Sequence, residues 1–281
     1  MPKSTNIEMP SPTTPKQFSG KCALITGGAR NIGLAIAKTL ARQGASVAIL
    51  DVCRDLKTIP YALSTTADLD EATREISSLG VKALGLSCDI RKESQVRPAF
   101  EKVVKELGGL DFLINNAGVA SLYPITRLTE KAWDEVLDVC LKGTYLCCRQ
   151  ALPRMIGQRY GKIVNISSVA GLRGLGLGVH YCAAKHGVIG LTKALAMEVA
   201  DHNINVNVVC PGTTESPILV GLAEQIQFTG DPYRHFARQH LFQDRPITPQ
   251  DVARTVTWLV SDESQPITGA VIAVDAGWSA Q

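Results

Sequence analysis

Residues 22–43 read CALITGGARNIGLAIAKTLARQ, and this stretch decides the fold. The apolar run Cys22–Thr26 has the length of a buried strand, and a helical pattern begins near Ile32. Glycines in the turn between them let the backbone approach a phosphate group, and the helix N-terminus supplies unpaired N–H groups and a partial positive charge. The stretch therefore predicts a strand–turn–helix unit that binds a pyrophosphate.

The same alternation of strand and helix continues along the chain. Short runs rich in Val, Ile and Leu predict strands at Cys22–Thr26, Ser46–Asp51, Ala83–Asp89, Leu110–Asn115, Lys162–Ser167, Asn205–Cys210 and Ala270–Asp275. Longer patterns predict helices at Ile32–Gln43, Asp68–Leu79, Glu93–Leu107, Glu130–Gln158, His180–His202 and Thr248–Val260. We therefore expect an α/β fold with one doubly wound parallel sheet of about seven strands and helices on both faces. Ligands of such sheets bind outside the carboxyl ends of the strands.

Length and composition predict one domain with a short tail. The chain has 281 residues, of which 45% are hydrophobic, and its net charge is +3. We expect a single domain at residues 18–281 and a disordered tail at residues 1–17, which is rich in Pro, Ser and Thr. The basic residues are scattered, which argues against a nucleic-acid partner, and no run approaches the roughly 20 apolar residues of a membrane span.

The eight cysteines show neither a C-x-x-C pair nor a metal-ligand spacing with histidine. Most of them fall inside apolar strands or helices, where a thiol behaves as a small hydrophobic group. Residues 1–17 lack the apolar run of a signal peptide. These features predict a cytoplasmic protein without a metal site.

Two segments interrupt the alternation. Val52–Ala67 is long for a connection between a strand and a helix. It is either a surface insertion or a flap over the adenosine half of a cofactor. Thr213–Pro246 mixes apolar and aromatic residues with several Arg and His. It is either a substrate lid at about residues 213–246 or a pair of amphipathic helices packed on the body or on another subunit.

The choice of dinucleotide depends on two residues with opposite effects. Asp51 closes the second predicted strand, eighteen residues after Gly33, from where its carboxylate can accept a hydrogen bond from a ribose 2′-OH. The same carboxylate repels a 2′-phosphate and so favours NAD over NADP. Arg30 lies in the glycine-rich turn and could instead pair with that phosphate. We give Asp51 the greater weight and expect NAD.

The segment Tyr181-Cys-Ala-Ala-Lys185 predicts acid–base chemistry. A tyrosine phenol has a pKa of about 10, too high for efficient proton transfer at neutral pH. An ammonium group four residues later on a helix lies on the same face, and its charge favours the phenolate. Lys185, together with a bound cofactor charge, is therefore expected to lower the pKa of Tyr181 and make it a general acid and base.

Five motifs occur in order: Thr26–Gly33, Asn115-Asn-Ala-Gly118, Ser168, Tyr181-x-x-x-Lys185 and Pro211-Gly212. With them the chain resembles the short-chain dehydrogenase/reductase family over about residues 18–281, and the resemblance implies a Rossmann fold. It implies that Tyr181 exchanges a proton with the oxygen of an alcohol or ketone and that Ser168 stabilises charge on the same oxygen. It also implies that Lys185 holds the nicotinamide ribose.

The resemblance further implies a set of cofactor contacts. Asp89 matches the position that contacts adenine, and the residues after Pro211 fix the nicotinamide carboxamide. The complete set that we expect to bind the cofactor is Gly27, Arg30, Asn31, Ile32, Gly33, Asp51, Asp89, Ile90, Asn115, Ala117, Gly118, Tyr181, Lys185, Pro211, Gly212, Thr214 and Ser216.

Two positions depart from the family pattern. Asn31 replaces the middle glycine of the turn, and asparagine is the non-glycine residue that best tolerates a left-handed backbone. Cys140 stands where the family commonly has an asparagine that completes a catalytic tetrad. That asparagine acts largely through its main-chain carbonyl, which a cysteine keeps, so we include Cys140 among the catalytic residues. The alternative is that Cys140 is only a packed thiol.

These motifs predict an enzyme that transfers a hydride between NAD and a secondary alcohol or ketone, such as a sugar, a polyol or another hydroxylated small molecule. One alternative is an NADPH-dependent reductase similar to 3-oxoacyl reductases. Another is a non-catalytic NAD-binding sensor or scaffold, suggested by Asn31 and Cys140. The insertion after Asp51 is also similar to that of carveol-type dehydrogenases, in which NAD is held tightly.

Residues near the substrate are harder to assign than the cofactor contacts. We expect the pocket to be bordered by Ser121, Leu122, Tyr123, Arg173, Leu175, His180, Glu215 and Ile218. Of these, His180 and Arg173 could recognise hydroxyl or carboxylate groups. Family members usually pair their long helices into four-helix interfaces, here Glu130–Gln158 and His180–His202, so we expect a homotetramer. The C-terminal residues, with Trp278, are expected to help in assembly.

Overall fold

The glycine-rich turn joins the first strand, β1 (Cys22–Thr26), to the first helix, α1 (Asn31–Arg42), as the sequence predicts. The structure is a computed structural model that describes residues 16–242 and 247–281. Most of the predicted tail, residues 1–17, lies outside the described residues, and so do residues 243–246 of the predicted lid.

One parallel sheet runs through the described part of the chain, with seven strands in the order β3-β2-β1-β4-β5-β6-β7. The remaining strands are β2 (Ser46–Asp51), β3 (Ala83–Ser87), β4 (Phe112–Asn115), β5 (Gly161–Ile166), β6 (Ile204–Pro211) and β7 (Val271–Val274). Strand order reverses between β1 and β4, which opens a crevice at their carboxyl ends. The predicted doubly wound Rossmann fold is confirmed.

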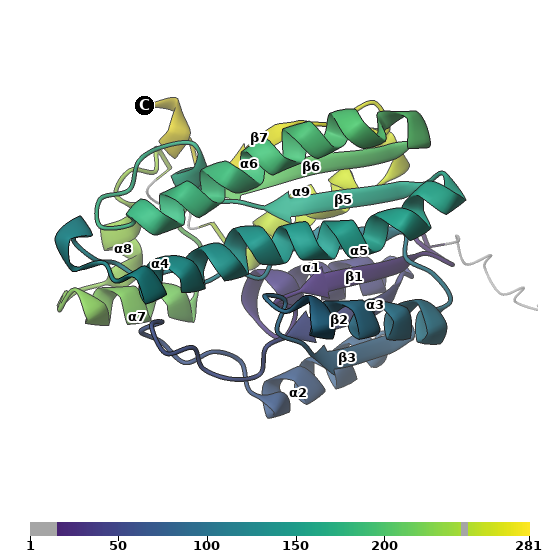
Figure 1. Cartoon of the computed structure of the whole chain (residues 1–281), viewed down its shortest axis with the longest axis horizontal. Coiled ribbons are helices and arrows are strands. Elements are labelled where there is room, and N and C mark those ends of the chain that lie inside the picture. The colour runs from purple at the N-terminus through teal and green to yellow at the C-terminus, as the bar shows by residue number, and fades with distance from the viewer. Residues whose placement is uncertain (1–15, 243–246) are drawn as a thin grey trace, which may run out of the picture.

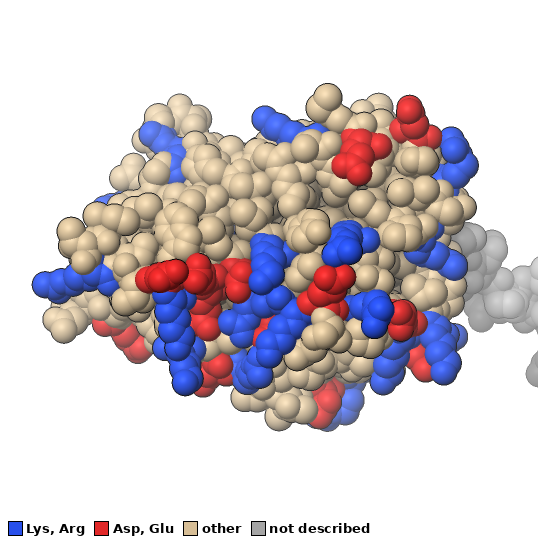
Figure 2. Space-filling view, in the orientation of Figure 1, with Lys and Arg blue, Asp and Glu red and all other residues tan. Residues whose placement is uncertain are grey.

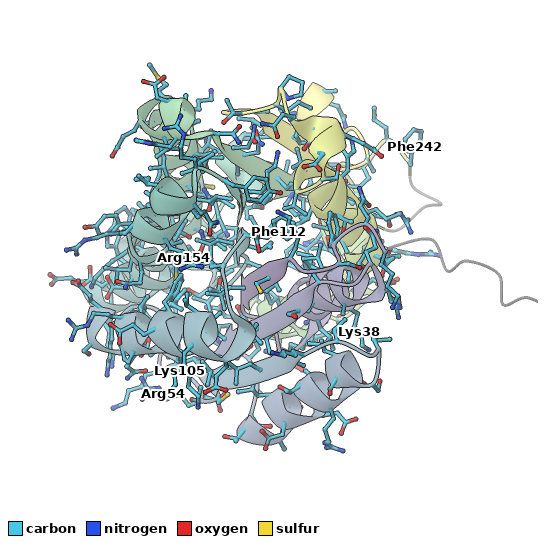
Figure 3. The ribbon with its side chains drawn as sticks, turned by 90° about the vertical axis from the view of Figure 1, so that its right-hand side faces the viewer. Lys38, Arg54, Lys105, Phe112, Arg154 and Phe242 are labelled. Carbon is cyan, nitrogen blue, oxygen red and sulfur yellow. The ribbon has the colours of Figure 1, made fainter. Side chains whose placement is uncertain are left out.

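Helices cover both faces of this sheet (Figure 1). One face carries α1, α2 (Thr66–Ser77) and α9 (Pro249–Leu259), which share a core cluster. The other face carries α3 (Glu93–Leu107), α5 (Gly143–Gln158) and α6 (Val179–Val199). The strands are buried on both faces, which explains their nearly continuous apolar runs. Phe112 of β4 is fully buried and lies between the two helix layers (Figure 3).

The predicted helix Glu130–Gln158 contains an irregularity that its apolar pattern does not reveal. It consists of α4 (Glu130–Leu137), a π-helical turn at Asp138–Lys142, and α5. A π turn widens the helix by one residue and is common at functional sites. Here it contains Cys140, whose carbonyl accepts a hydrogen bond from the Thr144 hydroxyl at 2.9 Å.

Beyond β6, the segment predicted as a lid contains α7 (Pro217–Gln225) and α8 (Pro232–Ala237). Both helices begin with proline, whose fixed φ suits the first helical position. Figure 1 shows them at the end of the sheet where the strands have their carboxyl ends.

The described residues contain neither a membrane-spanning helix nor a cluster of metal ligands. None of their helices is both long and apolar enough to cross a membrane. They also contain no group of three or more His, Cys, Asp or Glu side chains that could hold a metal ion. All eight cysteines lie in the described ranges and are free thiols, and six of them are buried.

Candidate active site

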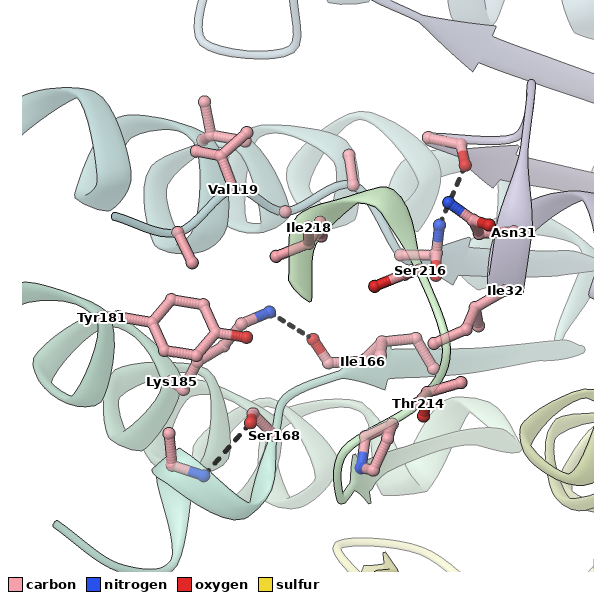
Figure 4. A pocket seen from close by; sticks show the side chains of 18 of the residues that line it. Asn31, Ile32, Val119, Ile166, Ser168, Tyr181, Lys185, Thr214, Ser216 and Ile218 are labelled. Carbon is pink, nitrogen blue, oxygen red and sulfur yellow. Dashed lines mark hydrogen bonds between the residues drawn. The ribbon is translucent and has the colours of Figure 1, made fainter. Parts of the chain in front are cut away.

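The predicted site residues meet in one cleft at the carboxyl ends of the strands, beside the reversal between β1 and β4. Most of the residues that we expected to bind the cofactor line this cleft. They are Gly27, Arg30, Asn31, Ile32, Asp51, Asp89, Ile90, Ala117, Gly118, Tyr181, Lys185, Pro211, Gly212, Thr214 and Ser216. Figure 4 shows Tyr181, Lys185 and Ser168 on one side of this cavity and Asn31, Ile32 and Ser216 on the other.

The glycine-rich turn is held in a shape that only small residues allow. Gly27 has a φ of +63°, and a Cβ there would lie 2.9 Å from Cα of Ala117. A Cβ on Gly33 would lie 2.0 Å from the Gly27 carbonyl oxygen, so Gly33 lets α1 pack on the turn rather than line the cleft. Asn31 has a φ of 49°, the left-handed conformation that the sequence predicts for it.

The start of α1 leaves donors for an anion. Its N-cap is Arg30, which makes no side-chain capping hydrogen bond, so the side chain leaves the first N–H groups of the helix unpaired. The guanidinium of Arg30 instead donates to the Ala62 carbonyl at 2.7 Å. Ala62 belongs to residues 52–65, hereafter the strap, which join β2 to α2.

Asp51 closes β2 and points into the cleft. Its carboxylate is buried and accepts hydrogen bonds from the Ala29 N–H at 3.3 Å and the Val52 N–H at 2.9 Å. Burial raises the pKa of this carboxyl, while the two N–H groups oppose that rise. A glycine-rich turn, a helix N-terminus with unpaired donors and a carboxylate at the next strand end fit the pyrophosphate and ribose of a dinucleotide.

Asp89 lines the cleft at the end of β3, and two arginines neutralise it. Arg54 of the strap donates to its carboxylate at 2.6 Å and Arg91 at 2.8 Å. Burial opposes ionisation, but the hydrogen bonds and charges of these arginines outweigh it and lower the pKa of Asp89 to about 2. Arg91 also pairs with Glu135 of α4 at 3.0 Å, and Glu135 accepts from the N–H and hydroxyl of Thr58 at 2.9 and 2.6 Å.

Asn115 requires a correction. We expected it to contact the cofactor, but its amide points into the core, where it donates to Asn165 at 2.8 Å and to the Cys148 sulfur at 3.2 Å. The neighbouring Asn116 lines the cleft instead, and its amide donates to the Thr26 and Gly27 carbonyls at 3.0 Å. Successive side chains of a strand alternate in direction, and β4 ends at Asn115, so the sequence left the choice between the two asparagines open.

The predicted catalytic trio comes from β5 and the start of α6. Lys185 follows Tyr181 by one turn of α6, and its Nζ lies 5.6 Å from the centre of the tyrosine ring. The ammonium is buried and donates to the Ile166 carbonyl at 2.9 Å. Ser168 follows β5 and lines the cleft beside Tyr181, and its hydroxyl accepts from the Ala170 N–H at 3.1 Å.

Burial is the main influence of the protein alone on the Tyr181 phenol. It raises the pKa of this group, neighbouring thiols including Cys140 add to the rise, and the Ser168 hydroxyl opposes it. The Lys185 ammonium donates to the Ile166 carbonyl. That Lys185 and a bound cofactor charge together lower this pKa stays a prediction.

Beyond Tyr181 the cleft is mostly apolar. Of the residues predicted for the substrate pocket, Ser121, Leu122, Arg173, Leu175 and Ile218 line it, whereas Tyr123, His180 and Glu215 do not. His180 is fully buried, with Nε2 2.9 Å from the Ser121 hydroxyl, and burial lowers the pKa of its imidazole. The guanidinium of Arg173 donates to the carbonyls of Trp278 and Gln281. His180 therefore lies outside the cleft, whereas Arg173 lines it with one guanidinium nitrogen bonded to the C-terminal segment.

Comparison with known proteins agrees with this geometry. Residues 21–227 match the family model described as short chain dehydrogenase. The chain is 36% identical to 3-oxoacyl-acyl-carrier-protein reductase of Thermotoga maritima, over 93% of this chain and 98% of that protein. It is 35% identical to (-)-trans-carveol dehydrogenase of Rhodococcus erythropolis, again over 93% and 98%. The crystal structure of carveol dehydrogenase from Mycobacterium avium in complex with NAD superposes with a TM-score of 0.90 at 29% identity, over 95% of this chain and 100% of that one.

The chain belongs to the short-chain dehydrogenase/reductase family. It is an oxidoreductase that acts on CH–OH or C=O groups. Family membership therefore supports an enzyme over the non-catalytic sensor or scaffold that Asn31 and Cys140 suggested.

Cys140 does not line the cleft of this dehydrogenase. Its side chain is buried, and its sulfur lies 3.4 Å from the Val119 carbonyl, within an apolar cluster. Its main-chain carbonyl accepts the hydroxyl of Thr144. The side chain is thus a packed thiol, and the expected part of the main-chain carbonyl in catalysis stays a prediction.

Several residues of the dehydrogenase site escaped the sequence-based prediction. The strap contributes Leu56, Tyr61, Leu63 and Ser64 to the cleft, the lid region contributes Leu219, Leu222 and Phe236, and the C-terminus contributes Trp278. Trp278, which we expected to serve assembly, therefore lines the cleft. The unusual length of the strap was the only sequence signal for its part in the site.

Proposed function

We propose that this dehydrogenase uses NAD to interconvert a compact, apolar secondary alcohol and its ketone. The observation that carries the proposal is that Tyr181, Ser168 and Lys185 line the same cleft as apolar side chains such as Leu122, Leu175 and Leu222. In the proposal, these apolar side chains hold the substrate beside the acid–base group.

In this proposal the chain supplies the proton chemistry. The Tyr181 phenol donates its proton to a ketone oxygen, or takes the proton of an alcohol in the opposite direction. The Ser168 hydroxyl donates to the same oxygen and stabilises its developing charge. Lys185 holds the nicotinamide ribose and adds positive charge beside the phenol. When bound, NAD supplies the hydride acceptor, and its reduced form the hydride donor.

Two contacts support NAD over NADP. The buried Asp51 carboxylate lies where an added 2′-phosphate would bring a second negative charge. Arg30, the residue that could neutralise that phosphate, is engaged by the Ala62 carbonyl. The Mycobacterium avium carveol dehydrogenase, to which the chain is similar, was crystallised with NAD.

The lining of the cleft supports a compact apolar substrate rather than a sugar acid or another charged molecule. His180 does not line the cleft, Arg173 donates to the Trp278 carbonyl, and Leu122, Leu175 and Leu222 supply apolar walls. The similarity to (-)-trans-carveol dehydrogenase supports an alicyclic alcohol as the first class to test. The similarity to a 3-oxoacyl reductase supports the rival, an NADPH-dependent enzyme for acyl thioesters.

One panel of assays tests the proposal. Purified protein is incubated with NAD or NADP and a set of alicyclic secondary alcohols, and with NADH or NADPH and a 3-oxoacyl thioester, while reduced nicotinamide is monitored. We expect turnover of the alcohols with NAD and little turnover of the thioester with either cofactor. Turnover of the thioester with NADPH alone would contradict the proposal and support the rival.

A further inference from the structure

The strap extends beyond the adenosine half of the cleft. Arg54 near its start pairs with Asp89, and Ala62 near its end accepts from Arg30, both on the cofactor side. Between these two ties the chain reaches the other side of the cleft, where the Tyr61 hydroxyl accepts a hydrogen bond from the Ala120 N–H at 2.9 Å. Figure 1 shows this loop running from β2 toward α7 before it returns to α2.

Tyr61 lies among residues that belong to the substrate side. Its ring packs in an apolar cluster with Ala120, Leu122, Leu222 and Tyr181. It lines the same cleft as Tyr181, and burial raises the pKa of its phenol, so the hydroxyl stays neutral and serves as an acceptor.

Helix α7 packs closely against Tyr61. A Cβ on Gly221 of α7 would lie 2.4 Å from Cβ of Tyr61, so the glycine allows the helix to approach the strap. Gln225 of the same helix bonds the Leu122 N–H and carbonyl, each at 2.8 Å. The strap, α7 and the loop after β4 therefore contact one another around Tyr61.

The position of Tyr61 is fixed by the rest of the strap. Leu56 and Ile59 are buried in an apolar cluster with Val136 of α4, and Thr58 is bonded to Glu135 through both its N–H and its hydroxyl. A ring that is anchored on both sides acts as a rigid wall. Removing it would enlarge the cavity beside Tyr181, since the surrounding groups are held by their own contacts.

We propose that Tyr61 is a specificity-determining residue that limits the size of the substrate. This inference rests on the proposed function, because it concerns the same site and the same apolar class of alcohol and ketone. The strap would then have two roles. Its other residues bond groups on the cofactor side of the cleft, and Tyr61 limits which substrates fit.

The test compares a compact alicyclic ketone with a fused-ring ketone that differs from it mainly in size. Tyr61→Ala is measured against Lys57→Ala, a control at an exposed strap residue that does not line the cleft. We expect the ratio of kcat/KM for the bulky over the compact substrate to rise on the order of tenfold in Tyr61→Ala alone. If thermal unfolding shows that the Tyr61→Ala variant is not folded, Tyr61→Leu is measured in its place.

Binding of both ketones to the NAD-loaded proteins is measured by calorimetry in parallel, so the inference does not depend on turnover. A ratio in the Tyr61 variant equal to that in Lys57→Ala, in binding and in any turnover, would overturn the role of Tyr61. Binding that shifts with the variant, without turnover of any alcohol or ketone by the wild type, would support Tyr61 and contradict the proposed function.

Discussion

The burial of Tyr181 predicts how the rate of each reaction direction depends on pH. Because burial raises the pKa of the phenol, it holds its proton at neutral pH, and this form is the one that ketone reduction requires. Alcohol oxidation requires the phenolate, whose population grows as the pH rises toward that raised pKa. We therefore expect kcat/KM for oxidation to increase from about pH 7 to about pH 10, while that for reduction stays level or falls. An oxidation rate that declines over this range, measured at saturating cofactor, would contradict the assignment.

Asp51 is the residue on which the choice of cofactor depends. The Ala29 and Val52 N–H groups bond different oxygens of the Asp51 carboxylate, so asparagine keeps an acceptor for only one of them while it removes the charge that repels a 2′-phosphate. We expect Asp51→Asn to narrow the preference for NAD over NADP by about tenfold, because about 1.4 kcal/mol of repulsion corresponds to that factor. The ratio of kcat/KM with the two cofactors measures it, and Lys57→Ala, at an exposed residue that does not line the cleft, is the control. An unchanged ratio in Asp51→Asn would remove Asp51 from this role.

Residue types with strict local requirements were predictable from the sequence. Asn31 adopts the left-handed φ expected of it, and Asp51 and Tyr181 lie in the predicted cleft. What the sequence could not supply is the direction of a side chain at a strand end, as Asn115 and Asn116 illustrate. It also could not supply the burial of Tyr181, which depends on segments distant in the chain.

Among the elements, the strap is expected to slow the release of the cofactor. Glu135 of α4 holds it through Thr58 and also orients Arg91 beside Asp89. We expect Glu135→Ala to increase the dissociation rate of NADH on the order of tenfold, because the strap loses its hydrogen bonds to α4. Stopped-flow fluorescence after displacement by excess NAD measures this rate. Glu130→Ala, an exposed residue of the same helix, is the control, and equal rates in the two variants would refute the role of the strap.

Elements were predictable where local pattern determines them. The strands and most helices fall close to their predicted positions because buried parallel strands and amphipathic helices have distinct periodicities. The π turn at Asp138–Lys142 changes that period by a single residue, which the apolar pattern does not register. The course of the strap depends on contacts such as Tyr61 with Ala120, which are distant in sequence and leave no local signal.

For the whole molecule, we expect a homotetramer built on α5 and α6. Charged side chains gather over α3 and α4 in Figure 2, while the surface over α6 shows few of them. Met197 of α6 is 84% exposed and Tyr145 of α5 is 46% exposed, so each of the two helices offers an apolar side chain that an interface could bury. Sedimentation should give a mass about four times the 30.1 kDa of the chain, and Met197→Glu should lower it. A wild-type monomer would contradict this expectation.

The central claim is that Tyr181 transfers the proton in this dehydrogenase, and the most direct measurement is the rate of alcohol oxidation in Tyr181→Phe. The phenylalanine keeps the ring that packs beside Ala120 and Leu122 and removes only the hydroxyl. With NAD and the best secondary alcohol of the panel, we predict a loss of kcat of at least about a hundredfold. NADH binding, measured by fluorescence, should stay close to that of the wild type. A variant that binds NADH and retains the wild-type rate would contradict the mechanism.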